Sequence, residues 1–277
     1  MAFRIFASQR HLFEGNVNIM GSGRLRFLSS GPFGLLRQWG RAVVDIVYPP
    51  QCAGCGIIIS RGGAFCSECW SGIGFIERPY CEILGLPFSS DPGPGMLSSE
   101  AIANPPPFDR LRSAVIHEGA ARKLVHQLKY LDRLDLVSTM AVWMLRASDG
   151  MIEQCDYIIP VPLHRRRFIS RRFNQSAELA RHLADLSGKP FLSSSVIRTK
   201  PTKRQVGLTA KGRQDNMRGA FAFAPGRELD VAGKRVVLVD DVYTTGATVS
   251  AVSRLLKKAG AADVTVLTFA MAISGPI

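Results

Sequence analysis

One short segment constrains the fold of this chain more than any other. Val236–Val239 are four apolar residues in a row, Asp240 and Asp241 follow them, and a turn rich in Thr and Gly leads into a helical pattern. An unbroken apolar strand of this kind is typical of a parallel sheet that is covered on both faces. In open α/β sheets, ligands bind where such a strand ends and the chain turns into a helix. The segment therefore predicts an α/β domain with a ligand site at residues 240–248.

The residue types of that turn suit a phosphate and a sugar. Backbone N–H groups at the start of a helix converge on an anion, and Gly246 allows the chain to approach it closely. Thr244, Thr245 and Thr248 add hydroxyl donors. The two carboxylates accept hydrogen bonds, so sugar hydroxyls or a hydrated Mg²⁺ are their natural partners. The chain has neither a Gly-x-Gly-x-x-Gly fingerprint nor a Walker A loop, which excludes the common nucleotide motifs.

Strands and helices alternate from Phe108 onward. This order predicts a parallel sheet with helices on both faces. The expected strands are residues 113–117, 157–161, 235–239 and 264–269, and the expected helices are residues 120–131, 134–147, 174–187 and 249–259.

Composition divides the rest of the chain. Residues 1–34 are rich in Arg and lack the apolar core of a secretory signal, so we expect a poorly ordered tail. Residues 35–86 hold a short amphipathic helix, which ends before Pro49, and a cysteine-rich module. Residues 87–107, where Ser, Gly and Pro cluster, predict a linker before the α/β domain of residues 108–277. We expect no internal repeat beyond the paired cysteines.

Four of the six cysteines form two Cys-x2-Cys pairs, Cys52/Cys55 and Cys66/Cys69. Four thiolates at this spacing can close a tetrahedron around Zn²⁺. Since so small a module is poorly stabilised by burial alone, the metal would supply much of its folding energy, and four protein ligands predict a structural site. Two disulfides are the alternative reading. A chain without a secretory signal favours reduced thiols, and so zinc and a cytoplasmic location.

The positive charge is concentrated in one segment. The whole chain has a formal charge of +13, and residues 161–218 contain 14 Lys and Arg against 3 Asp and Glu. Such a segment predicts an anionic partner, although a merely solvated basic face is the alternative. The sequence has no run of about 18 apolar residues, so we expect no membrane span. An apolar fraction of 46% excludes a mainly disordered chain.

The segment of residues 236–248 resembles the signature of type I phosphoribosyltransferases, which bind phosphoribosyl pyrophosphate (PRPP) together with Mg²⁺. The resemblance implies that the two acids hold the ribose 2′- and 3′-hydroxyls and that the turn wraps the 5′-phosphate. The PRPP-binding residues that it implies are Asp240, Asp241, Tyr243, Thr244, Thr245, Gly246, Ala247 and Thr248.

The same resemblance implies a role for the basic segment. In phosphoribosyltransferases an earlier turn contacts the pyrophosphate, and a mobile loop, here residues 198–217, covers the site during reaction. No general base is assigned. The candidates for contact with the pyrophosphate are Arg165, Arg166, Arg167, Lys200, Lys203 and Arg204.

Over about residues 45–271 the chain is similar to the ComF (competence protein F) family. The paired cysteines, residues 126–130 (HQLKY), residues 160–164 (PVPLH) and residues 173–175 (FNQ) carry this resemblance. It implies a zinc-ribbon module joined to a phosphoribosyltransferase domain and a role in DNA uptake. The family often has a third cysteine pair, which here keeps Cys81 but has Leu84 in place of the second thiol. We therefore expect one zinc ion.

Three functions remain open. The first is a Mg²⁺-dependent transferase that moves ribose 5-phosphate from PRPP to an unidentified acceptor. The second is a non-enzymatic competence factor that binds single-stranded DNA beside the DNA-uptake machinery, and the third is a PRPP-sensing regulator. Phe168 and Phe173 are the few aromatic residues near the basic segment, which gives strand binding by base stacking thin support.

Overall fold

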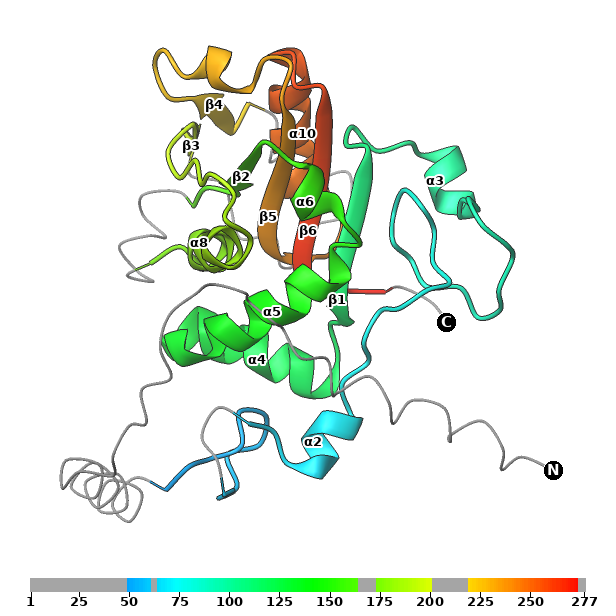
Figure 1. Cartoon of the computed structure of the whole chain (residues 1–277), viewed down its shortest axis with the longest axis vertical. Helices are drawn as coiled ribbons and strands as arrows, with labels where there is room; N and C mark the ends of the chain where they lie inside the picture. The colour runs from blue at the N-terminus through cyan, green and yellow to red at the C-terminus, as the bar shows by residue number, and fades with distance from the viewer. Residues whose placement is uncertain (1–48, 61–63, 164–172, 201–218, 274–277) are drawn as a thin grey trace, which may run out of the picture. The chain divides into compact units, whose positions relative to one another are not determined.

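A four-stranded parallel sheet forms the centre of the protein in a computed structural model, which describes residues 49–60, 64–163, 173–200 and 219–273 (Figure 1). The strand order is β1-β6-β5-β2, which confirms the predicted α/β fold. The strands are β1 (Arg110–Ile116), β2 (Tyr157–Pro160), β5 (Arg235–Tyr243) and β6 (Asp263–Met271).

Helices cover both faces of this sheet. Alternate residues of β5 point to opposite sides: Val237 and Val239 pack with one core cluster, and Val236 and Leu238 with another. The first cluster contains residues of α4 (Gly119–Tyr130), α5 (Val137–Ala147) and α8 (Gln175–Ser187), and the second contains residues of α10 (Ala247–Lys258). The short helices η1 (Leu134–Leu136), α6 (Met151–Gln154) and η2 (Glu228–Val231) complete the connections.

The end of β5 and the start of α10 differ from the sequence prediction. β5 continues past its apolar run because Asp240 pairs with Thr268 and Tyr243 with Met271 of β6. α10 begins at Ala247, two residues before the predicted start. The two acids therefore lie on the strand itself, and only three residues separate the strand from the helix.

A two-stranded antiparallel sheet was not predicted. It consists of β3 (Val196–Arg198) and β4 (Phe221–Phe223), and the Thr199 N–H donates to Ala220 O at 2.9 Å just beyond it. Arg198 was expected to open a mobile loop, but its guanidinium lies 5.3 Å from the centre of the Phe221 ring. Residues 201–218 of that expected loop are outside the described residues.

The cysteine module forms a ribbon with a short helix, which we call the first ribbon (residues 50–60 and 64–72). It ends in α2 (Ser67–Ser71). Gln127 of α4 donates from Nε2 to Ala53 O at 3.0 Å, and the Trp70 ring centre lies 5.8 Å from that of Trp143 on α5. The first ribbon thus contacts α4 and α5 of the α/β domain. The helix expected at residues 34–48 lies outside the described residues.

The chain contains an internal repeat, so the expectation of no repeat beyond the cysteines is wrong. Residues 79–104, the second ribbon, repeat the hydrogen bonds of the first. The Cys52 N–H donates to Ile57 O at 2.7 Å, and the Cys81 N–H donates to Leu86 O at 2.8 Å. The isolated β-bridges follow the same rule, since Gln51 pairs with residue 58 and Tyr80 with residue 87.

The second halves of the two ribbons correspond as well. Cys66 caps the first turn of α2, and Ser98 caps α3 (Ser99–Ala103), each through a side-chain acceptor for the N–H three residues later. Composition predicts a linker at residues 87–107, but much of this segment forms the second ribbon, and Ala101 in it is buried. The sequence does not reveal this repeat, because the second ribbon has a cysteine at only one of the four equivalent positions, Cys81.

The second ribbon and the residues before it lie along β1, the edge strand of the parallel sheet. The Ile76 N–H donates to Ala114 O at 3.0 Å, and the Leu111 N–H donates to Ile83 O at 2.7 Å. A Cβ on Gly85 (φ +60°) would lie 2.6 Å from the Leu111 carbonyl oxygen, so glycine is needed there. These contacts cover an edge that would otherwise offer unpaired backbone groups. No helix in the described part of the chain is long and apolar enough to cross a membrane.

Candidate functional site

The acid pair lies at the carboxyl end of β5, where the two acids are held by two different helices. The Ser176 hydroxyl, in the first turn of α8, donates to Asp240 Oδ1 at 2.8 Å. The Asp241 N–H donates to the same oxygen at 2.9 Å. Lys129, in the last turn of α4, places its Nζ 2.9 Å from Asp241 Oδ1. The carboxylates are therefore held in place by α8 and α4.

Burial and the neighbouring Asp241 charge act on Asp240. Burial raises the pKa of Asp240 to about 7, with a further contribution from the Asp241 charge, and the hydrogen bond from Ser176 opposes both. At the end of β1, burial lowers the pKa of His117, and the nearby charges of Lys129 and Arg122 act in the same direction. The site thus places the ammonium group of Lys129 beside a pair of neighbouring carboxyl groups.

The turn after β5 is shaped to approach an anion closely. Gly246 has φ +67° and begins α10, which has no side-chain cap on its first turn. A Cβ at this position would lie 2.7 Å from the Tyr243 hydroxyl oxygen, so only glycine fits. The N–H groups at the start of a helix favour an anion. A small cavity opens beside them, lined by Asp240, Val242, Tyr243, Thr244, Gly246, Ala247, Thr248 and Val249.

The structure brings together most of the predicted PRPP residues. Asp240 and the turn line the cavity, and Thr245 is an exposed residue of the same turn. Asp241 is buried and paired with Lys129. Of the candidates for contact with the pyrophosphate, Lys200 is exposed and lies two residues after the end of β3. The candidates Arg165, Arg166, Arg167, Lys203 and Arg204 lie outside the described residues and stay predictions.

Lys129 and Ser176 were missed as site residues. Both belong to helices that follow strands whose carboxyl ends meet at the edge where Asp240 and Asp241 lie. Lys129 is part of the HQLKY segment and Ser176 directly follows the FNQ segment. Both residues therefore lie in or beside segments that carry the family resemblance. The sequence did not reveal their contacts, because these join residues more than 60 positions apart.

The first ribbon has a donor set that fits zinc. The Sγ atoms of Cys52, Cys55, Cys66 and Cys69 all lie within 4.8 Å of one another, and those of Cys55 and Cys66 are 3.7 Å apart. Tetrahedral Zn²⁺–thiolate bonds of 2.3 Å place sulfur atoms about 3.8 Å apart. A Cβ on Gly54 would lie 2.8 Å from Cys69 Sγ, so the turn needs glycine to close.

Backbone donors prepare one of these thiols for a metal. Burial opposes ionisation of Cys52, but backbone N–H groups outweigh it and lower the pKa of this thiol to about 6. The N–H groups of Gly54 and Cys66 lie 3.4 and 3.2 Å from Cys52 Sγ. Thiolates are the form that binds zinc, so these backbone donors favour the ligating state of Cys52.

The second ribbon does not fit zinc. Its equivalents of the four ligands are Cys81, Leu84, Ser98 and Ala101, and two of these side chains are hydrocarbon. Cys81 Sγ instead accepts from the Ser98 N–H at 3.2 Å, the Leu84 N–H at 3.4 Å and the Ser98 hydroxyl at 3.3 Å. A single thiol with a hydroxyl and two apolar groups leaves no tetrahedral donor set.

Two family models match the chain. A double zinc ribbon domain matches residues 43–101, which span both ribbons, and a phosphoribosyl transferase domain matches residues 176–276. The DNA utilization protein YhgH of Escherichia coli (strain K12) is 33% identical over 228 residues, which are 80% of this chain and 96% of that protein. Competence protein F of Haemophilus influenzae is 41% identical over 115 residues, 42% of this chain and 50% of that protein.

The chain belongs to the ComF family. A further relative, YhgH of Salmonella typhimurium, is 37% identical over 67% of this chain and 81% of its own length. The double zinc ribbon model accounts for the internal repeat of this ComF protein, although only the first copy keeps a zinc donor set. Among solved structures, a purine phosphoribosyltransferase from Pyrococcus horikoshii matches 50% of this chain and 77% of its own, at 20% identity and a TM-score of 0.32. A likeness so distant carries no argument about this chain.

Proposed function

We propose that this protein binds PRPP at the carboxyl end of β5. The observation that carries the proposal is the direct succession of an acid pair, a turn closed by Gly246 and the start of α10, around one small cavity. The acids are acceptors for sugar hydroxyls, and the helix start with its threonines offers donors to a phosphate. Both partners occur in one molecule when the ligand is a ribose 5-phosphate derivative.

The proposed reaction is transfer of ribose 5-phosphate to an acceptor. The acceptor forms a bond to C1 of the ribose, the bond from C1 to the pyrophosphate oxygen breaks, and pyrophosphate leaves with the electron pair. Asp240 and Asp241 would hold the ribose hydroxyls, and the turn of residues 243–248 would hold the 5′-phosphate. The arginines and lysines of the basic segment would stabilise the charge on the departing pyrophosphate.

Magnesium fits this site as a companion of the substrate. Mg²⁺ is a hard cation that prefers oxygen ligands and is commonly held by substrate phosphates and few protein groups. When bound with PRPP it would neutralise charge on the pyrophosphate. The chain's own part is then to fix the sugar and the 5′-phosphate so that C1 faces the acceptor.

Calorimetric titration with PRPP and Mg²⁺ tests the binding step. The Asp240→Asn/Asp241→Asn variant should lose affinity by at least about a hundredfold, because two acceptors that are charged are lost. Asp185→Asn on the exposed side of α8 is the matched control and should bind like the natural protein. Absence of PRPP binding by a folded, zinc-loaded protein would overturn the proposal. Release of pyrophosphate with a supplied acceptor separates a transferase from a PRPP sensor.

Binding of single-stranded DNA is a second candidate function. It is favoured by the 14 Lys and Arg against 3 Asp and Glu in residues 161–218, and relatives carry the names DNA utilization protein and competence protein. If it operates, affinity for an oligonucleotide should fall steeply with salt. It should also survive the Asp240→Asn/Asp241→Asn change, whereas PRPP affinity should not.

A further inference from the structure

The ion pair between Lys129 and Asp241 joins the last turn of α4 to the end of β5. The Lys129 Nζ lies 2.9 Å from Asp241 Oδ1, and both side chains are largely buried, with exposed fractions of 22% and 11%. A screened surface pair would contribute little, but a sheltered pair at this distance holds its geometry. α4 otherwise faces the core through Leu124, Val125 and Leu128, so this lysine extends from a well-anchored helix.

The two acids differ in the partners that hold them. Asp240 is held by neutral donors, the Ser176 hydroxyl and a backbone N–H, whereas Asp241 is held by a full positive charge. Two neighbouring carboxylates repel each other, and the positive charge of Lys129 offsets that repulsion at Asp241. A sugar hydroxyl needs an acceptor oxygen in a fixed place, and the ion pair fixes the Asp241 carboxylate.

We propose that Lys129 is a positioning residue of the sugar site, which holds the Asp241 carboxylate in place as an acceptor and so makes the site selective for adjacent hydroxyls. This inference rests on the proposed function. A carboxylate has about four acceptor positions, so the bond through Oδ1 leaves room for a hydroxyl. Among the described residues, the other titratable groups beside Asp241 are Asp240 on the same strand and His117 just after β1, and neither is a permanent cation.

The test compares three ligands against four proteins. Ribose 5-phosphate, 2-deoxyribose 5-phosphate and inorganic phosphate are titrated into the natural protein, Lys129→Met, Lys129→Arg and Lys123→Met. Lys123 is an exposed lysine of the same helix and serves as the matched control. PRPP with Mg²⁺ is titrated into the natural protein first, since failure there overturns the proposed function before Lys129 is tested.

We expect a loss of affinity for ribose 5-phosphate and not for inorganic phosphate. Lys129→Met should lower the affinity for ribose 5-phosphate about tenfold or more, as for a lost hydrogen bond to a charged group. The ratio of the affinities for ribose 5-phosphate and 2-deoxyribose 5-phosphate should also fall. Inorganic phosphate, which needs only the turn and α10, should bind within about twofold of the natural protein. Lys129→Arg, which keeps the charge, should restore most of the preference for ribose, and Lys123→Met should change nothing.

Three outcomes would overturn the role of Lys129 while leaving PRPP binding intact. Equal losses for ribose 5-phosphate and phosphate would show a general charge effect. Tighter binding by Lys129→Met would show that the lysine blocks the site. Unchanged ligand preference in a folded variant would show that the ion pair is structural. If Lys129→Met does not fold, Lys129→Gln supplies the test, because glutamine keeps a donor near Asp241 without the charge.

A double-mutant cycle adds an independent measurement. In an Asp241→Asn background the lysine has no carboxylate to hold, so Lys129→Met should cause little further loss of ribose 5-phosphate affinity. Additive losses would mean that Lys129 acts on the ligand without Asp241, which contradicts the proposal.

Discussion

The two ribbons have the same backbone plan but are stabilised in different ways. In the first, four thiols converge within 4.8 Å, and few of its side chains are buried against the rest of the protein. In the second, Leu84 and Ala101 replace two of the thiols and lie in a core cluster with Leu111 and Leu256. The exposed fractions of Leu84 and Ala101 are only 5% and 2%.

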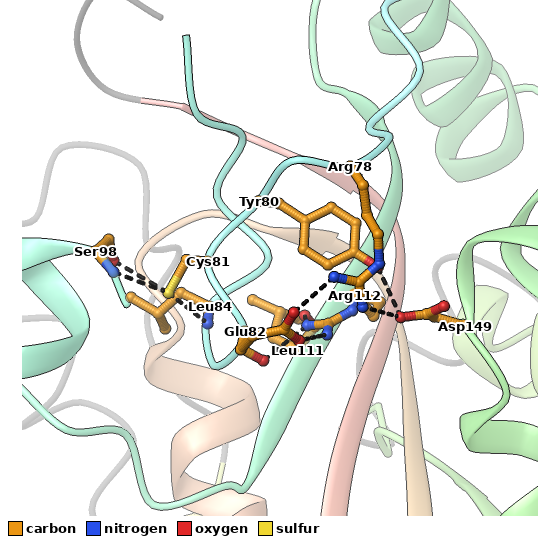
Figure 2. Close-up of polar contacts among 9 residues, drawn as sticks. All are labelled: Arg78, Tyr80, Cys81, Glu82, Leu84, Ser98, Leu111, Arg112 and Asp149. Atoms are coloured by element: carbon orange, nitrogen blue, oxygen red, sulfur yellow. Dashed lines mark hydrogen bonds and ion pairs between the residues drawn. The ribbon is translucent and has the colours of Figure 1, made fainter. Parts of the chain in front are cut away.

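Polar contacts tie the second ribbon to β1 in a way that the first ribbon lacks. Arg112 of β1 donates to Glu82 O and to Glu82 Oε2, both at 2.9 Å (Figure 2). The guanidinium carbons of Arg112 and Arg78 lie 4.4 and 4.8 Å from the centre of the Tyr80 ring. The Tyr80 hydroxyl donates to Asp149 at 2.9 Å. A ribbon that gains a large neighbour can therefore keep its fold without a metal.

Removal of zinc should affect the two ribbons differently, and this is the largest expected effect. Structural zinc contributes on the order of 10 kcal/mol to small domains, so a chelator should unfold the first ribbon while the second stays folded. Hydrogen exchange should show lost protection in residues 50–60 and 64–72 and retained protection in residues 79–104. The natural protein should contain one zinc per chain. Two zinc ions, or loss of both ribbons together, would contradict this view of the repeat.

Restoring the missing thiols should make the two ribbons alike. Leu84→Cys/Ser98→Cys/Ala101→Cys gives the second ribbon the four ligands of the first, and zinc content should rise from one to two per chain. Leu84→Ala/Ala101→Ser is the control, since it perturbs the same cluster without adding thiols. A triple variant that folds and still binds one zinc would show that the backbone of the second ribbon cannot close around a metal.

Gly85→Ala should weaken the contact between the second ribbon and β1. The new Cβ would lie 2.6 Å from the Leu111 carbonyl oxygen and would occupy a left-handed conformation. We expect a loss of about 3 kcal/mol in the free energy of unfolding, measured by urea denaturation. Gly93→Ala has φ +94° but open space around it, so it should cost only about 1 kcal/mol. Equal losses would mean that the close approach to Leu111 is unimportant.

The smallest expected effect concerns Glu82 and pH. The Arg78 hydrogen bond is the main cause that lowers the pKa of Glu82, and Arg112 acts in the same direction. Because its pKa is lower in the folded state, the stabilisation is present above the ordinary pKa of a glutamate, about 4.3, and is lost as the pH falls through the folded value. Glu82→Gln should therefore cost about 1 kcal/mol at pH 7, and the difference should shrink in acid. A cost independent of pH would exclude the ion pairs as its source.

The sequence predicted the α/β core well because its helices and strands carry long periodic patterns of apolar residues. It misplaced the end of β5, because pairing with β6 carries a strand through two acids that look like its end. β3 and β4 are three residues each, too short for a periodic signal. The second ribbon was hidden because three of its four ligand positions no longer carry the residue that defines a ribbon.

The candidate site shows the same limit. The turn of residues 243–248 could be predicted because the sequence places its glycine and threonines side by side. Lys129 and Ser176 could not be assigned a role, since each reaches the acids from a separate helix. A local motif indicates which ligand is bound, but the groups that tune it come from elsewhere in the fold.

The hydrogen bonds along β1 also bear on how this protein can be taken apart. The backbone of Ile76 and Ile83 completes the outer edge of β1, so the change in composition near residue 107 is not a boundary between independent folding units. A fragment that starts at residue 108 would expose unpaired backbone groups along β1 and an apolar cluster around Leu111. The second ribbon and the residues before it thus complete the α/β domain, and we expect the two parts to fold only when they are expressed together.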